Sequence, residues 1–149
     1  MPVVILLADD DSEDCMLTKE ALAETKLAND LNVVGDGEEL LDYLYQRGRF
    51  TPETAPRPGL ILLDLNMPKL DGREALAVIK SDPKLRHIPV IVLTTSKADE
   101  DVFRTYDLGA NSYISKPVTF EGLSQVMRAL ADYWFGIVVL PKDENGLSH

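Results

Sequence analysis

Short apolar runs recur along the chain, and each is followed by a longer segment with helical periodicity. The strongest runs cover residues 3–8, 60–63 and 89–94, and weaker runs cover residues 32–34 and 112–114. Continuous apolar runs of this length, rich in Val, Ile and Leu, are typical of strands that are buried on both faces of a sheet. The pattern therefore predicts five short strands.

The segments between the strands repeat their apolar residues at helical spacing. The predicted helices cover residues 13–26, a segment around 40–45, and residues 72–81, 99–108 and 120–133. The last helix has the clearest pattern, because its apolar residues fall at i, i+3, i+4 and i+7: Leu123, Val126, Met127 and Leu130. Asp11 or Ser12 can cap the first helix.

Strand and helix alternate five times, which predicts a doubly wound α/β fold: a five-stranded parallel sheet with helices on both faces. The longest irregular stretch, residues 47–59, contains three prolines. We interpret it as a surface loop rather than a linker, because each flank is too short to fold alone. We therefore expect one domain over residues 1–133 and a C-terminal extension over 134–149, apolar at 134–141 and polar at its end.

The composition narrows the class of protein. Of the 149 residues, 45% are apolar and 27% are charged, as in folded soluble domains. The net charge of −10, without a basic cluster, argues against nucleic acid as a partner. The longest apolar run is too short for a membrane span and lacks the basic flank of a signal peptide. The single cysteine excludes an internal disulfide framework and fits a reducing cytoplasm.

Polar residues follow or close the predicted strands. Asp9 and Asp10 follow the first strand, Asp64 follows the third, Thr94 closes the fourth, and Lys116 follows the fifth. On such folds, ligands bind at the carboxyl ends of the strands, near a switch in strand order. Three carboxylates meeting there would repel one another unless a cation lies among them. Oxygen ligands with room for water suit Mg²⁺.

The same set of residues suits phosphoryl transfer. A metal ion and a lysine neutralise phosphoryl oxygens while a carboxylate oxygen attacks in line, which gives an aspartyl phosphate. Asp64 is the expected nucleophile because it ends the most buried strand. Asp9 and Asp10, neighbours on one turn, are the expected metal ligands.

Each of these features also has a purely structural interpretation. Paired aspartates before a helix are common as caps and partners of the helix dipole. Asp64 can be a turn residue, Thr94 can lie in an ordinary approach to a helix, and Lys116 can lie in a solvated loop. The functional interpretation depends on all of them lying at successive strand ends, on one edge of one fold.

Four stretches together carry a family resemblance: residues 5–11, 62–72, 89–96 and 113–117. As an ordered set, they resemble the receiver domains of two-component response regulators, over residues 3 to about 133. The resemblance implies a flavodoxin-like (βα)5 receiver fold. It implies a protein that catalyses only its own phosphorylation and dephosphorylation and is not otherwise an enzyme.

The resemblance also implies a role for each matching residue. Asp64 corresponds to the phosphoacceptor and Lys116 to the lysine that pairs with the phosphoryl group. Asp10 corresponds to the direct Mg²⁺ ligand and Asp9 to a second acid that often acts through water. The backbone carbonyl of Asn66 corresponds to the group that completes the metal shell.

Further matching residues correspond to the switch of this family. Thr94 corresponds to the hydroxyl that turns toward the phosphoryl group, and Tyr113 to the aromatic residue that swings inward with it. The side chains of Asn66 and Ser96 correspond to positions that tune the rate of phosphate loss.

A narrower resemblance is to the single-domain regulators that pair with bacterial phytochromes. The 48–59 loop, residues 66–76 and 93–96, and the 133–141 stretch carry it. It implies a light-regulated sensor histidine kinase as phosphoryl donor, and a homodimer through the fourth helix, fifth strand and fifth helix. The apolar stretch 134–141 either joins that dimer or folds back on its own domain.

Other functions fit less well. A pseudo-receiver that binds partners without phosphorylation has no need of the complete set Asp9, Asp10, Asp64, Thr94 and Lys116. A haloacid-dehalogenase-type phosphatase needs an acid two residues after its nucleophile, where this chain has Asn66. The chain also lacks the Ser/Thr/Gly-rich loop of a flavodoxin and the Gly-Lys-Ser/Thr ending of a nucleotide-binding loop.

Overall fold

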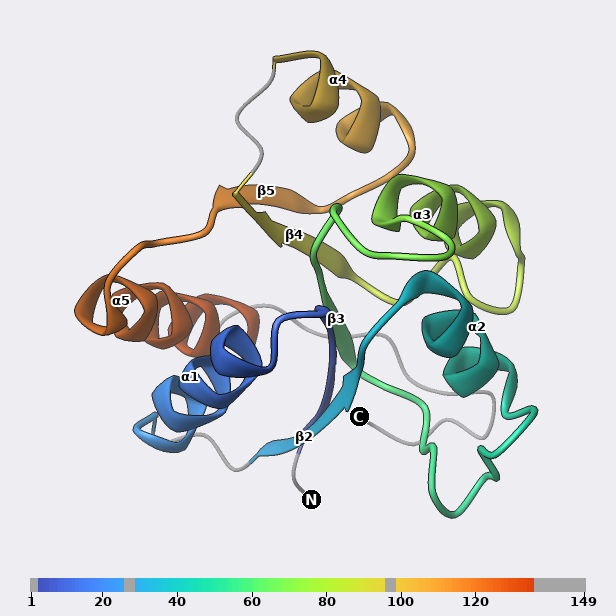
Figure 1. Ribbon diagram of the computed structural model, residues 1–149, viewed down its shortest axis with the longest axis horizontal. Helices are drawn as coiled ribbons and strands as arrows, with labels where there is room; N and C mark the ends of the chain where they lie inside the picture. The colour runs from blue at the N-terminus through green and yellow to red at the C-terminus, as the bar shows by residue number, and fades with distance from the viewer. Residues whose placement is uncertain (1–2, 26–28, 96–98, 136–149) are drawn as a thin grey trace.

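A computed structural model describes residues 3–25, 29–95 and 99–135. Within them, five strands form one parallel sheet of order β2-β1-β3-β4-β5 (Figure 1). The strands are β1 (Val3–Ala8), β2 (Asn29–Val34), β3 (Leu60–Leu63), β4 (Val90–Thr94) and β5 (Ser112–Ser115). The helices are α1 (Ser12–Ala23), α2 (Gly37–Tyr45), α3 (Gly72–Ser81), α4 (Asp99–Asp107) and α5 (Phe120–Leu130). The doubly wound fold expected from the sequence is confirmed.

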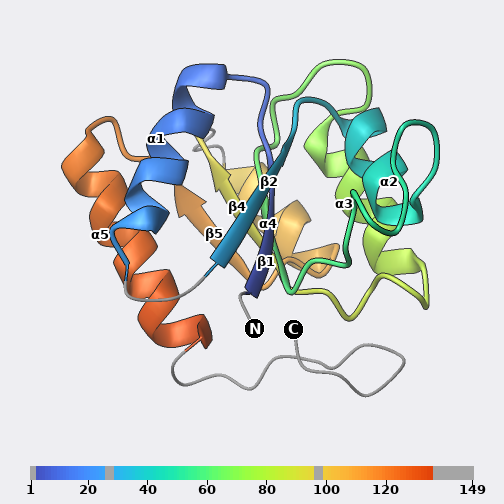
Figure 2. The ribbon, with the colours of Figure 1, turned by 90° about the horizontal axis from the view of Figure 1, so that it is seen from below.

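Helices cover both faces of the sheet, because successive strand residues point to opposite faces. Leu6, Ile61 and Val92 face α2 and α3, whereas the neighbouring residues of the same strands pack with α1 and α5. Figures 1 and 2 show α1 and α5 on one side and α2 and α3 on the other. α4 lies beside the edge strand β5. A bidentate ion pair between Arg73 on α3 and Asp101 on α4, with N···O distances of 2.7 and 2.6 Å, ties these two helices together.

Several boundaries differ from the sequence-based expectation. β2 begins at Asn29 rather than at residue 32, because its polar residues still pair with β1, from Val3 opposite Asn29 onward. α1 ends at Ala23 rather than at residue 26. The last helix, expected to run to residue 133, is α-helical only to Leu130 and continues as a π-helical turn over Ala131–Phe135.

Residues 47–59 form a loop that is fixed to the domain. The hydroxyl of the buried residue Tyr43 donates a hydrogen bond to the carbonyl of Pro56 at 2.9 Å, and the side-chain amide of Gln46 donates one to the carbonyl of Ala55 at 3.0 Å. The ring of Phe50 packs edge-on against Tyr43. The stretch is therefore an anchored surface loop, as expected, and not an extended linker.

The helices in the described part of the chain are too short or too polar to cross a bilayer. Asp11, one of the two expected capping residues, caps α1: its carboxylate accepts hydrogen bonds from the backbone of Glu13 at 2.9 Å and Asp14 at 3.2 Å. This cap fixes where α1 begins and therefore how the loop after β1 turns. That loop and the loop after β3 lie at the same end of the sheet (Figure 2).

Candidate functional site

Backbone hydrogen bonds extend the sheet by one residue at several strand ends and bring the polar residues together. The amide of Asp9 donates to Val34 at 3.0 Å, that of Asp64 donates to Ala8 at 2.9 Å, and that of Lys116 donates to Thr94 at 2.8 Å. The carboxyl ends of parallel strands therefore present these side chains at one edge. The sequence predicted this convergence, and the structure contains it.

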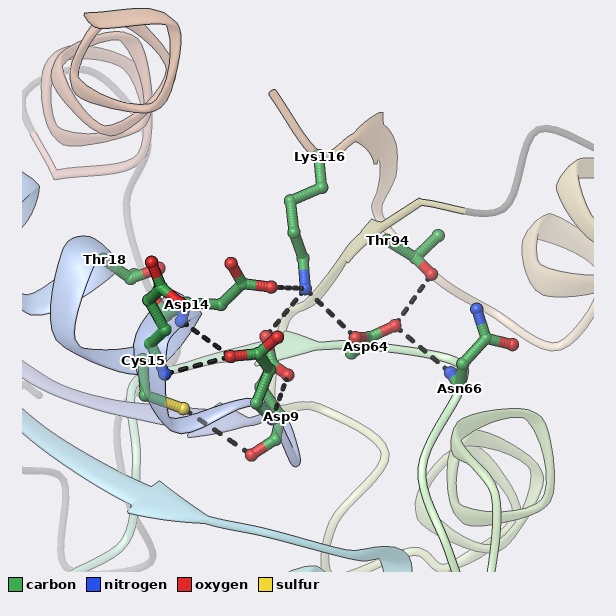
Figure 3. Close-up of polar contacts among 10 residues, drawn as sticks. Asp9, Asp14, Cys15, Thr18, Asp64, Asn66, Thr94 and Lys116 are labelled. Atoms are coloured by element: carbon green, nitrogen blue, oxygen red, sulfur yellow. Dashed lines mark hydrogen bonds and ion pairs between the residues drawn. The ribbon is translucent and has the colours of Figure 1, made fainter. Parts of the chain in front are cut away.

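The ammonium group of Lys116 is at the centre of the site (Figure 3). Its Nζ lies 2.8 Å from Asp9 Oδ2, 3.1 Å from Asp64 Oδ2 and 3.0 Å from Asp14 Oδ2. Burial alone would lower the pKa of this lysine, but the hydrogen bonds to Asp9 and Asp14 and the charge of Asp64 raise it overall. Lys116 is therefore a fixed positive charge at the end of β5.

Both oxygens of the Asp64 carboxylate are held in place. Oδ1 accepts hydrogen bonds from the Thr94 hydroxyl at 2.8 Å and from the backbone amide of Asn66 at 3.1 Å. Oδ2 accepts the hydrogen bond from Lys116. Asp64 is buried, and it follows a strand whose four residues are all buried. A carboxylate fixed in this way has a defined direction for attack on an incoming group.

Glycine at position 72 sets the distance between α3 and the backbone that carries Asp64. The amide of Gly72 donates to the carbonyl of Leu65 at 2.9 Å. A β-carbon at this position would lie 2.4 Å from the carbonyl oxygen of Asp64 and 2.7 Å from the Cα of Leu65. Only glycine allows this approach without a shift of the backbone.

Asp9, Asp10 and Asp64 form a group that can hold a cation. Each offers one carboxylate oxygen, and these oxygens lie within 4.8 Å of one another. Burial raises the pKa of Asp9, against the opposing effects of hydrogen bonds from Lys116 and from the backbone of Asp11. Asp10 is exposed, which leaves solvent access for water ligands. Several carboxylates with one ammonium leave an excess of negative charge, so the donor set fits a hard divalent cation.

Of the expected switch and tuning residues, the structure describes Thr94, Tyr113 and Asn66. Tyr113 lies on β5, partly buried against the core on the side of α2 and α3. Its backbone amide donates a hydrogen bond to the hydroxyl of Tyr106 on α4 at 3.1 Å. The side chain of Asn66 is exposed beside Asp64. Ser96, the other expected tuning residue, lies outside the described residues, as does the stretch 136–149.

Asp14 is a residue of the site that the sequence pattern did not predict. It lies on the first turn of α1, and its carboxylate accepts a hydrogen bond from Lys116. Adjacency to a strand end predicts the other members of the site, whereas Asp14 belongs to a helix. Its position in the helix turn next to Asp9 and Asp10 is the only signal that the sequence offers.

The single cysteine also lies at the edge of the site. The Cys15 thiol lies 3.6 Å from the carbonyl oxygen of Asp9, to which it donates. Burial, together with the negative charge of Asp9, raises the pKa of this thiol to about 12. The thiol is therefore protonated at neutral pH and is not a nucleophile here.

The fold and the site define the class of protein: the chain belongs to the response regulator receiver domain family. The model of that family matches residues 5–128. Response regulator Rcp1 of Synechocystis sp. is 42% identical to the chain over 140 residues, which cover 94% of each protein.

Solved structures agree with this assignment. The phosphorylated cyanobacterial phytochrome response regulator RcpA superposes with a TM-score of 0.89 and 44% identity, covering 95% of this chain and 100% of RcpA. The Mn²⁺-bound form of Rcp1 superposes with a TM-score of 0.86 and 42% identity, covering 94% of this chain and 99% of Rcp1.

Proposed function

We propose that this receiver accepts a phosphoryl group on Asp64 from a sensor histidine kinase and signals through the resulting change in its own surface. The observation that carries the proposal is the fixed Asp64 carboxylate, held by Lys116 and Thr94 beside Asp9 and Asp10. Receiver domains are the partners of histidine kinases, and the family match supports that class of donor.

The chemical step is a transfer of one phosphoryl group. A carboxylate oxygen of Asp64 forms a bond to phosphorus while the bond from phosphorus to the donor imidazole nitrogen breaks. The nitrogen keeps the electron pair of that bond, so the imidazole leaves as a neutral group when its other nitrogen carries a proton. Lys116 and Thr94 hold the phosphoryl oxygens through charge and hydrogen bonding. Hydrolysis of the aspartyl phosphate at the same site then returns the protein to its starting state.

Mg²⁺ is the proposed cofactor. Asp9, Asp10 and Asp64, with the backbone carbonyl of Asn66, are the proposed ligands, and the spacing of the three carboxylates supports the proposal. When bound, Mg²⁺ would neutralise charge on the phosphoryl oxygens. The Mn²⁺-bound form of Rcp1 shows that a relative takes a divalent cation.

Thr94 and Tyr113 are the proposed switch. Phosphorylation adds negative charge and acceptor oxygens at Asp64. Thr94 then gains a contact that exists only in the phosphorylated state, which is the differential interaction that a two-state switch requires. Tyr113 borders α4, so movement of its ring changes the α4–β5–α5 surface. Asn66 and Ser96 are the proposed positions that tune phosphate loss.

The histidine kinase that donates the phosphoryl group is proposed to be of the phytochrome type and to act in the cytoplasm. The similarity to RcpA, a phytochrome response regulator, supports this assignment. A homodimer is proposed through the α4–β5–α5 face, where Phe103 is 75% exposed and Tyr106 is 47% exposed. The extension 134–149, beyond the proposed receiver domain 1–133, is the alternative or additional dimer contact.

Intact mass after incubation with acetyl phosphate, with and without Mg²⁺, tests the proposal. We expect a gain of one phosphoryl group that requires Mg²⁺ and is labile in the way of an acyl phosphate. Asp64→Asn should abolish the gain and leave the fold intact, because the amide has the same shape. Asp42→Asn, which changes a partly exposed aspartate on α2, is the matched control and should be labelled like the wild type.

The opposite results have distinct meanings. Acid-stable labelling of Asp64→Asn would contradict the assignment of the nucleophile. If the wild type gains no phosphoryl group from acetyl phosphate or from a phosphorylated phytochrome kinase, the chain acts as a binding module without phosphorylation.

A further inference from the structure

Lys116 already uses its full capacity to donate hydrogen bonds. An ammonium group has three N–H bonds, and those of Lys116 point to three different carboxylates, on Asp9, Asp14 and Asp64 (Figure 3). The lysine side chain is only 9% exposed, so water competes little for these donors. A phosphoryl oxygen that takes a hydrogen bond from Lys116 must therefore displace one of the three carboxylates.

The three carboxylates differ in what the loss of this contact would cost. The side chain of Asp9 is 3% exposed and that of Asp64 is 9% exposed, whereas that of Asp14 is 34% exposed. Until the oxygen of Asp64 has bonded to phosphorus, loss of the Lys116 contact would leave either buried residue, Asp9 or Asp64, as a carboxylate without its cation, which is strongly unfavourable. Water can replace the lysine at Asp14. Asp14 is therefore the partner that Lys116 can release most easily.

We propose that Asp14 is a positioning residue that holds Lys116 in the unphosphorylated protein and releases it when a phosphoryl group reaches Asp64. The inference rests on the proposed function and deepens it. Asp14 competes with the phosphoryl group for the same N–H bond. It therefore slows phosphorylation, and it destabilises the phosphorylated state relative to a protein in which this N–H bond is free.

Replacement of the charge at position 14 gives the first test. Asp14→Asn keeps the shape of the side chain but weakens its hold on Lys116. We expect phosphorylation by acetyl phosphate, followed by intact mass with Mg²⁺ present, to become about two- to fivefold faster, the scale of a partly exposed ion pair. Binding of fluoroberyllate with Mg²⁺, a phosphoryl mimic that needs no chemical step, should tighten by a similar factor.

Two further variants separate this role from a merely structural one. Asp14→Glu retains the carboxylate and should return both quantities toward the wild-type values. Glu13→Gln removes an exposed charge from the same helical turn, next to Asp14 in the chain, and should leave the rate unchanged. Thermal unfolding of each variant verifies that the fold is retained.

A double-mutant cycle with Lys116→Gln tests whether Asp14 acts through the lysine. Asp14→Asn should have no effect in the Lys116→Gln background. The inference is overturned if Asp14→Asn equals the wild type, if Asp14→Glu behaves like Asp14→Asn, or if the effect persists without Lys116. A wild type that neither gains a phosphoryl group nor binds fluoroberyllate contradicts the proposed function itself, and the inference falls with it.

Discussion

At the scale of single residues, the site depends on how buried negative charge is balanced. Asp9 and Asp64 are both buried at the carboxyl ends of neighbouring strands, and Lys116 is the cation that contacts both. Burial raises the pKa of Asp9, so the folded protein holds a proton there more tightly than the unfolded chain does. A divalent cation would favour the charged carboxylate instead.

This balance predicts how Mg²⁺ affects stability at different pH values. Without metal, Asp9 contributes favourably to the free energy of unfolding at pH values below about 3.9, the pKa of an aspartate in the unfolded chain. This contribution is lost as the pH rises through the higher pKa that Asp9 has in the folded protein. Binding of Mg²⁺ needs the charged form, so the stabilisation by Mg²⁺ should grow over the same range. It should reach about 1.4 kcal/mol at about ten times the Kd of Mg²⁺. Urea unfolding at several pH values, with and without Mg²⁺, measures it.

Asp9→Asn should lose this response to Mg²⁺, because it removes a charged ligand. Asp42→Asn, which changes a partly exposed aspartate on α2 that pairs with Arg47, should keep the full response. Stabilisation by Mg²⁺ that is the same at every pH, or that survives in Asp9→Asn, would show that the cation binds elsewhere.

At the scale of elements, the site depends on how closely helix starts approach the strand ends. α1 begins at the Asp11 cap, directly after the acids that follow β1. α3 begins at Gly72, against the backbone of Asp64 and Leu65. These two helix starts fix the loops that carry Asp9, Asp10 and Asp64, so packing of the helices controls the geometry of the carboxylates.

Gly72→Ala should therefore disturb both stability and function. The new β-carbon would meet the carbonyl oxygen of Asp64, so the backbone must shift at a cost of about 1–3 kcal/mol. Urea unfolding should report this loss, and phosphorylation by acetyl phosphate should slow. Gly35→Ala is the matched control, because a β-carbon at Gly35 meets no atom within 4 Å. Equal stability of the two variants would contradict the role of close approach at Gly72.

At the scale of the whole molecule, the edge strand β5 and helix α4 present the proposed output face. Tyr106 on α4 accepts a hydrogen bond from the backbone of Tyr113 on β5, so the two elements form one surface. Phe103, one helical turn before Tyr106, is the more exposed of the two aromatic residues. Exposed aromatic side chains grouped in this way are typical of protein interfaces.

Phe103→Glu should weaken the proposed homodimer at least about tenfold, because it places a charge in an apolar contact. Sedimentation velocity over a range of concentrations, with and without phosphorylation, measures the change. Met16→Glu is the control: it alters another exposed apolar residue, on α1, away from α4 and β5. A dimer that resists Phe103→Glu but is lost on deletion of residues 134–149 would assign the contact to the extension instead.

The sequence alone determines most of the fold of this protein and most residues of its site. Apolar runs define the strands, their alternation with helices defines a parallel sheet, and such a sheet brings its strand ends to one edge. Asp9, Asp10, Asp64, Thr94 and Lys116 can therefore be grouped from the sequence, because each is adjacent to a strand or closes one. The start of β2 could not be predicted, because its first two residues, Asn29 and Asp30, are polar and do not belong to an apolar run, although both pair with β1.

Only the tertiary structure decided which helical residues join the site. The direction of Asp14 depends on the rotation of α1 about its axis, which is set by the packing of α1 against α5 and the sheet rather than by local sequence. The close approach at Gly72 likewise exists only once α3 lies against the loop after β3. The sheet determines the position of a residue that is adjacent to a strand. The position of a residue on a helix depends instead on packing between segments that are far apart in the sequence.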